Sequence, residues 1–126
     1  MKELLITCAQ KNLPPRKGCI ELLEGEKEVV PGVYAIPAPG HTPGHMALVI
    51  SAGGAQLLHL ADMVLHPMHL EYPAWRSVFD LHEDNAATTR RRLLDRAAVE
   101  NVNVLAYHFP FLRDRKLTIS LSRYSF

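Results

Sequence analysis

The chain has 126 residues, 48% of them hydrophobic, which is enough for one globular domain with a core of its own. Fourteen basic residues against thirteen acidic ones give a formal charge of +1, so the composition offers no electrostatic basis for binding nucleic acid or an anionic membrane. No apolar stretch has the length of a signal-peptide core or a membrane span, so we expect a soluble cytoplasmic protein in which Cys8 and Cys19 are free and partly buried.

Strand signals dominate the first half of the chain. Residues 3–9 form a short apolar segment, and a polar connector containing two prolines follows up to Gly18. The apolar runs 19–23 and 28–30 flank a turn at residues 24–26, and residues 33–36 form the first clear strand. Residues 46–50 and 55–60 are apolar runs joined by a Ser-Ala-Gly-Gly turn, a pattern that predicts a β-hairpin.

One helix dominates the second half. Residues 63–81 lack a clear period, which indicates a long structured loop with at most one short helix. Acidic residues and an apolar stripe at helical spacing predict a helix over residues 83–100, on which Arg90, Arg91 and Arg92 are expected to form a solvated face. Residues 102–107 are then predicted to form a buried strand, and residues 117–124 a last strand.

His41, Asp62 and His108 each follow one of these apolar strands. If the strands are neighbours in one sheet, their ends bring an imidazole, a carboxylate and a second imidazole to one rim. These are ligands of zinc and related divalent metals, and a carboxylate can bridge two ions. Each residue also has a structural interpretation: a hydrogen bond within a Gly/Pro turn for His41, a turn cap for Asp62, and packing at a strand end for His108.

Three motifs together resemble the later metal motifs of the metallo-β-lactamase superfamily. They are Gly40-His41-Thr42-Pro43-Gly44-His45, Leu60-Ala61-Asp62 and Tyr107-His108-Phe109-Pro110-Phe111. The resemblance extends over residues 19–111 and is strongest to the branch with methyl parathion hydrolase-like and lactonase-like enzymes. It implies an α+β fold, the αββα sandwich, of which this single partial domain (residues 1–126) supplies roughly the C-terminal half as one mixed sheet with a flanking helix.

The resemblance also implies roles for the three residues. His41 would bind the first metal, His108 the second, and Asp62 would be the bridging carboxylate and the catalytic residue that holds the two metals together. The cofactor would be two zinc ions, with manganese, iron or cobalt as alternatives. The implied reaction is attack of a metal-bound hydroxide on an ester, a lactone or a phosphotriester.

The sequence departs from the family pattern in two ways. The His-x-His-x-Asp-His motif, which supplies the remaining metal ligands in the family, occurs nowhere in the 126 residues. Leu65 stands where lactonase-type members carry a tyrosine, which favours the phosphotriesterase-like branch. The alternative interpretation is therefore a catalytically inactive, truncated or split-fold protein that self-associates or pairs with a chain carrying the N-terminal half. A dimer is expected under both interpretations, because half of a two-sheet sandwich leaves one apolar sheet face uncovered.

Further residues near these motifs are expected to support the site or to bind a small-molecule substrate. By the resemblance, Thr42 and His45 hold the loop through hydrogen bonds and do not bind metal directly. The loop after Asp62 either lines an apolar substrate pocket or packs its own aromatic side chains as a small core. The candidate pocket residues are Leu65, His66, His69, Trp75 and Phe111.

Overall fold

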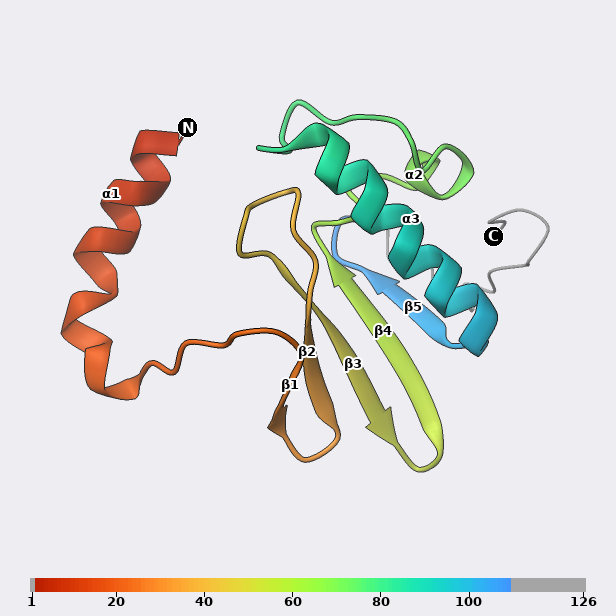
Figure 1. Cartoon of the computed structure of the whole chain (residues 1–126), viewed down its shortest axis with the longest axis horizontal. Coiled ribbons are helices and arrows are strands. Elements are labelled where there is room, and N and C mark those ends of the chain that lie inside the picture. The colour runs from red at the N-terminus through yellow and green to blue at the C-terminus, as the bar shows by residue number, and fades with distance from the viewer. Residues whose placement is uncertain (1, 110–126) are drawn as a thin grey trace.

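A five-stranded mixed sheet forms the centre of the protein. The computed structural model describes residues 2–109, and Figure 1 shows the arrangement. Strands β1 (Lys27–Val30), β2 (Val33–Pro37), β3 (Met46–Ala52) and β4 (Ala55–Ala61) are successively antiparallel, and β5 (Asn103–Ala106) pairs in parallel with β4. The predicted hairpin of β3 and β4 and the predicted strands β2 and β5 are thus confirmed.

Helix α3 (Glu83–Glu100) connects β4 to β5 and covers one face of the sheet (Figure 1). Glu83 and Asp84 stabilise its first turn, where the helix dipole favours negative charge. It ends at Asn101, whose left-handed φ of 51° lets its amide bond to the carbonyls of Ala97 and Ala98. The helix therefore has the bounds that the sequence predicts, and the crossover makes a parallel pair possible.

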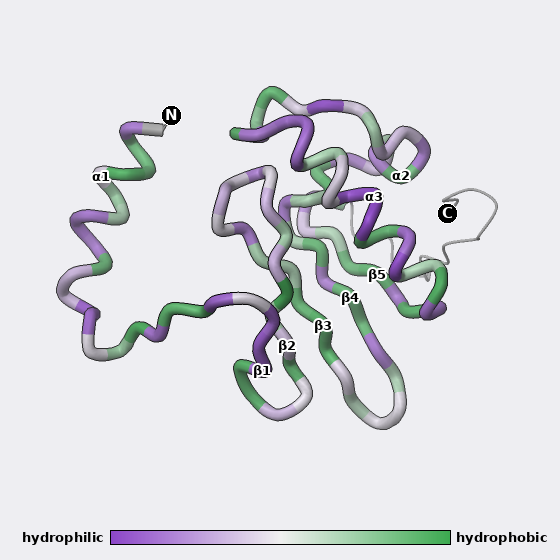
Figure 2. The backbone as a smooth tube through the Cα atoms, in the orientation of Figure 1, coloured by the Kyte–Doolittle hydropathy of each residue, from purple (hydrophilic) through white to green (hydrophobic). Residues whose placement is uncertain are grey.

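The hydrophobic core lies between α3 and the sheet. Alternate residues of the strands point toward the helix, and hydrophobic residues concentrate along β3 and β4, whereas α3 has both hydrophilic and hydrophobic turns (Figure 2). The side chains that bury almost their entire surface in this layer include Ile36, Leu58, Leu60, Met63, Leu93 and Leu94. One mixed sheet with a flanking helix is the fold that the sequence predicts.

The opposite face of the sheet carries apolar side chains that α3 does not cover. Leu48, His59 and Leu105 form one row across β3, β4 and β5, and Leu105 remains 45% exposed. Val30, on edge strand β1, is 55% exposed. Among residues 2–109, no second sheet lies on this face.

The N-terminal segment differs from its prediction. Helix α1 (Lys2–Asn12) and the 3-10 helix η1 (Pro14–Cys19) occupy residues that the sequence indicates only as an apolar segment and a connector, and α1 stands apart from the sheet in Figure 1. Residues 19–23 form no strand. Cys8 and Cys19 are free, as predicted, but exposed, so their predicted partial burial is wrong.

The long loop between β4 and α3 contains one short helix, α2 (Met68–Glu71), as predicted. Within the described part of the chain, none of the helices is long and apolar enough to cross a membrane. The predicted strand over residues 117–124 lies outside the described residues.

Candidate metal centre

The ends of three strands bring His41, Asp62 and His108 to one edge of the sheet. Strands β2 and β4 are both antiparallel to β3, and β5 is parallel to β4, so β2, β4 and β5 all end at the same edge. His41 lies in the loop after β2, Asp62 directly follows β4, and His108 lies in the turn after β5. The sheet topology therefore explains how His41 and His108, 67 positions apart in the chain, both come to lie beside Asp62.

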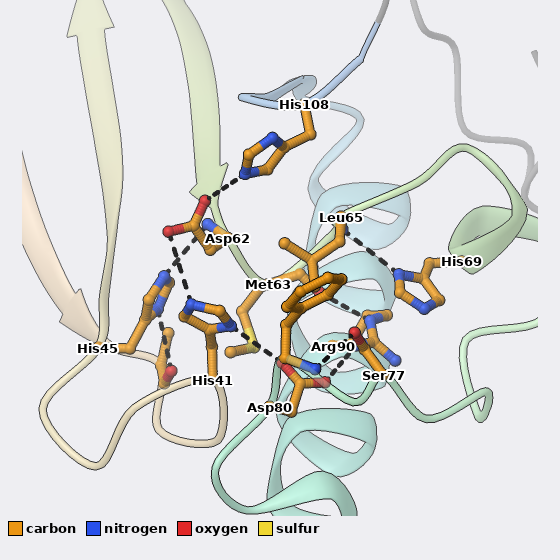
Figure 3. Close-up of polar contacts among 12 residues, drawn as sticks. His41, His45, Asp62, Met63, Leu65, His69, Ser77, Asp80, Arg90 and His108 are labelled. Atoms are coloured by element: carbon orange, nitrogen blue, oxygen red, sulfur yellow. Dashed lines mark hydrogen bonds and ion pairs between the residues drawn. The ribbon is translucent and has the colours of Figure 1, made fainter. Parts of the chain in front are cut away.

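Asp62 faces both histidines with different oxygen atoms. His108 Nε2 lies 3.0 Å from Asp62 Oδ1, and His41 Nε2 lies 3.8 Å from Asp62 Oδ2 (Figure 3). The Asp62 and His108 side chains are partly open to solvent, at 37% and 46% exposure. The Asp62 carboxylate therefore presents one oxygen to each histidine.

The backbone before Asp62 adopts an unusual conformation that aims its side chain. The pairing of β4 with β5 shifts register between His59 and Ala61, which is the signature of a β-bulge. Ala61 has a φ of 48°, a left-handed conformation that alanine rarely adopts, and the amide of Met63 closes the turn on the carbonyl of Leu60 at 3.1 Å. The tight turn directs the Asp62 carboxylate toward the histidines at a cost in backbone strain.

The loop that carries His41 is fixed against the start of helix α3. The amides of Leu81 and His82 donate to the carbonyls of His41 and Gly40, each at 3.0 Å. Gly40 has a φ of 144°, and a Cβ at this position would lie 2.3 Å from the backbone of Ala86. Only glycine allows the loop to approach the helix this closely.

Thr42 and His45 hold the same loop from inside. The backbone carbonyl of Thr42 accepts from the amides of Gly40 at 3.1 Å and His45 at 3.2 Å. His45 Nδ1 lies 3.1 Å from the Ala38 carbonyl, and its Nε2 accepts from the Asp62 amide at 3.2 Å. Burial lowers the pKa of His45, which favours the neutral ring that this bridge requires. Both ring nitrogens are thus engaged with backbone groups.

A fully buried carboxylate, Asp80, contacts Nδ1 of His41, the ring nitrogen that does not face Asp62. His41 Nδ1 lies 3.1 Å from Asp80 Oδ1, and the Asp80 side chain has no exposed surface (Figure 3). The sequence pattern indicates no role at the site for Asp80, which appears only as an acidic residue near the start of a helix. The one available signal was the position of an acidic residue at the end of a long loop that begins at Asp62.

Arg90 is buried, so the prediction that it belongs to a solvated arginine face is wrong for this residue. Its side chain is completely buried, with Nη2 at 3.4 Å from Asp80 Oδ2, whereas Arg91 and Arg92 are exposed as predicted. Burial lowers the pKa of the Arg90 guanidinium, and the charge of Asp80 acts in the opposite direction. The prediction failed for this residue because its partners lie in distant parts of the loop and leave no local trace in the helix.

The candidate pocket residues have different environments. His69 is buried, its Nδ1 accepts from the Leu65 amide at 3.3 Å, and burial lowers its pKa to about 4. Trp75 is half exposed and stacks on Tyr72 with ring centroids 4.5 Å apart. His66 is exposed, and its Nδ1 accepts from the Met68 amide at 3.2 Å. Phe111 lies outside the described residues.

The donor atoms around Asp62 fit a divalent metal in type and in spacing. A zinc ion bonded at about 2.0–2.2 Å to a nitrogen and an oxygen separates these atoms by roughly 3.4 Å at the tetrahedral angle. The two observed separations, 3.0 and 3.8 Å, lie on either side of this value. Over residues 2–109, however, no three or more His, Cys, Asp or Glu side chains form a group that could hold an ion. The described residues therefore fit as part of a metal site and need additional ligands.

Known proteins share parts of this chain's sequence. No family model matches the chain. Over 49 residues it is 45% identical to an N-acyl homoserine lactonase of a Bacillus species, covering 39% of this chain and 18% of that protein. Over 59 residues it is 39% identical to an N-acyl homoserine lactonase of Bacillus cereus, covering 47% of this chain and 22% of the relative.

Solved structures extend this likeness to almost the whole chain. The match to AidC, a dizinc quorum-quenching lactonase, has a TM-score of 0.79 at 23% identity and covers 94% of this chain and 40% of that one. The match to the hydrolase AbOPH of the beta lactamase superfamily has a TM-score of 0.66 at 22% identity, over 81% and 36% of the two chains. AiiA from B. thuringiensis follows with 0.59 at 27% identity, over 68% and 34%. The chain therefore has part of the metallo-β-lactamase fold.

The chain spans less than half the length of the relatives it matches. The predicted likeness to the metallo-β-lactamase superfamily and the predicted partial sandwich are confirmed. The roles of His41, Asp62 and His108 as metal ligands stay predictions, supported by their convergence at one edge of the sheet.

Proposed function

We propose that the chain contributes one side of a two-metal hydrolytic centre that cleaves an ester, a lactone or a phosphotriester. The observation that carries this proposal is the Asp62 carboxylate, whose two oxygens face two different histidines at 3.0 and 3.8 Å. His41 and His108 would each bind one ion through Nε2, and Asp62 would bridge the two ions. The relatives named lactonases support a lactone as the substrate. The relative named only as a hydrolase supports the wider set of esters, lactones and phosphotriesters.

Bound metals would supply Lewis acidity and lower the pKa of a coordinated water. The residues of the chain have separate tasks around them. Asp62 would hold the ions from a position that the strained turn at Ala61 fixes. His45 holds the amide of Asp62 and the carbonyl of Ala38, so it ties the β4 end to the His41 loop. His69 is buried inside the loop, where its Nδ1 accepts from the Leu65 amide and so supports the backbone after Asp62.

The remaining ligands must come from outside residues 2–109, since each ion receives only one histidine and the shared carboxylate from them. We therefore expect the isolated chain to bind metal weakly. Losing even a supporting partner of a ligand typically weakens affinity about 10 to 100-fold, and losing ligands weakens it more.

A second candidate function is a non-catalytic protein whose open sheet face pairs with another chain. The partly exposed apolar residues Val30 and Leu105, on the sheet face opposite α3, favour this candidate. Half of a two-sheet sandwich leaves an apolar surface that needs a cover. The partner would be a second copy of this chain or a chain with the complementary half of the fold.

Metal content, mass in solution and hydrolysis distinguish the two functions. The chain is purified, loaded with Zn²⁺, Mn²⁺ or Co²⁺, and tested on an N-acyl homoserine lactone, an aryl ester and a phosphotriester. Metal-dependent hydrolysis that disappears in His41→Gln and Asp62→Asn, but not in the control His59→Gln on the opposite sheet face, would support the hydrolase. An oligomer that binds none of the three metals even in large excess, and that hydrolyses none of the substrates, would refute the hydrolytic function and favour the second function.

A further inference from the structure

A buried ion pair connects the candidate metal centre to helix α3. Asp80 has no exposed side-chain surface, and its two oxygens have different partners: Oδ1 contacts His41 Nδ1 at 3.1 Å, and Oδ2 contacts Arg90 Nη2 at 3.4 Å. Figure 3 shows the resulting row from Asp62 through His41 and Asp80 to Arg90. The acidic side chain therefore stands between a proposed ligand and the core.

Arg90 uses its other donors on the backbone of the long loop. Its Nε donates to the Met63 carbonyl at 2.7 Å, and its Nη1 donates to the carbonyls of Pro73 and Trp75 at 2.9 and 2.8 Å. Met63 is the residue after Asp62. One rigid guanidinium thus fixes the chain beside Asp62 and, through Asp80, the ring of His41.

The contact with Asp80 determines which nitrogen of His41 carries the proton. An ionised carboxylate only accepts hydrogen bonds, so His41 Nδ1 must donate, which leaves the lone pair on Nε2 in the neutral ring. Nε2 is the nitrogen that faces Asp62. A carboxylate on the far nitrogen of an imidazole ligand fixes its tautomer and its orientation.

We propose that Asp80 and Arg90 are a positioning pair for the candidate metal centre: Asp80 sets the tautomer and direction of the His41 ring, and Arg90 locks Asp80 and the backbone beside Asp62 into one frame. The consequence for metal binding rests on the function proposed above, whereas the effect on His41 does not. Neither residue touches the reacting atoms. Burying a charged pair is costly, and here one guanidinium donates four hydrogen bonds to hold it. We therefore assign the pair a positioning role in addition to its packing in the core.

The tautomer of His41 in the metal-free chain tests the first part. Long-range ¹H–¹⁵N spectra at mildly alkaline pH distinguish a protonated ring nitrogen from an unprotonated one, and His41→Gln identifies the signal of His41 among the seven histidines. We expect an unprotonated Nε2 in the wild-type chain and a mixture of tautomers in Asp80→Ala. The control Asp84→Ala removes an exposed carboxylate paired with Arg76 and should leave the His41 signal unchanged.

Zinc affinity tests the second part. Competition with a chromophoric chelator should show about 10 to 100-fold weaker Zn²⁺ binding for Asp80→Ala than for the wild type and Asp84→Ala. A wild-type His41 with its proton on Nε2, or an Asp80→Ala spectrum identical to that of the wild type, would overturn the proposal even if the chain binds zinc. The expected tautomer in a chain that binds no zinc would support the orientation of His41 by Asp80 and refute the hydrolytic function instead. Because the wild-type spectrum is decisive, the test survives a variant that fails to fold.

Discussion

Gly40 is the position where a single methyl group should displace the His41 loop. In Gly40→Ala the new Cβ would lie 2.3 Å from the Cα and N of Ala86 and 2.8 Å from its Cβ. These atoms belong to helix α3, so no flexible side chain can move aside. The loop must retreat by about 1 Å or more to restore ordinary van der Waals distances.

The expected loss of stability combines three effects. Alanine at a φ of 144° costs about 1–3 kcal/mol of backbone strain, and overpacking adds about 1–3 kcal/mol. A retreating loop also weakens the hydrogen bonds from His82 to Gly40, from Leu81 to His41, and from the Thr89 hydroxyl to the Pro39 carbonyl. Because these effects overlap, we expect a decrease of about 3–5 kcal/mol in the free energy of unfolding.

Urea unfolding followed by circular dichroism measures this change, and Gly44→Ala is the matched control. Gly44 lies in the same loop, and a methyl group added there would meet no heavy atom within 4 Å. Its φ is not left-handed either, so the substitution should be neutral or stabilise by up to about 1 kcal/mol. Equal unfolding midpoints for Gly40→Ala and Gly44→Ala would refute the close approach of the loop to α3.

Three further predictions concern the turn, the buried arginine and pH. Ala61→Gly should stabilise the fold by about 1 kcal/mol, because glycine tolerates a φ of 48° without strain, whereas Ala87→Gly in α3 should destabilise it by a similar amount. Arg90→Met should destabilise by about 3–5 kcal/mol, because it leaves the buried Asp80 without its charge partner, and the exposed neighbour Arg91→Met should change little. Stability should fall as the pH decreases from about 6.5 to about 4. In the folded state the pKa of His69 is about 4, below its ordinary value of 6.5, so over this range the unfolded state binds more protons than the folded state. This loss should reach the order of 3 kcal/mol and shrink in His69→Gln, whose amide oxygen can still accept from the Leu65 amide.

Thermal and urea unfolding measure all three. A destabilising Ala61→Gly would contradict strain at the turn, and an Arg91→Met variant as unstable as Arg90→Met would contradict the special role of Arg90. The same pH dependence in wild type and His69→Gln would show that His69 does not titrate below its ordinary pKa in the folded state.

The local pattern of the sequence determined the elements that carry the site. The alternation in β3 and β4, the glycine turn between them and the period of α3 each depend on neighbouring residues, so they could be predicted from the chain itself. The order of the motifs around His41, Asp62 and His108 also predicted the metallo-β-lactamase fold, and the structure brings these three residues to one edge of the sheet.

Only the tertiary structure decided how that edge is supported. Arg90 lies in a run of three arginines whose pattern indicates a solvated face, and it is buried because carbonyls from residues 63, 73 and 75 converge on its guanidinium. Asp80 reaches His41 across 39 positions, and Gly40 is needed because Ala86 approaches it. Periodicity reports what a residue does relative to its own helix or strand. The partners of a buried charge come from other elements, so its role is decided only when the chain has folded.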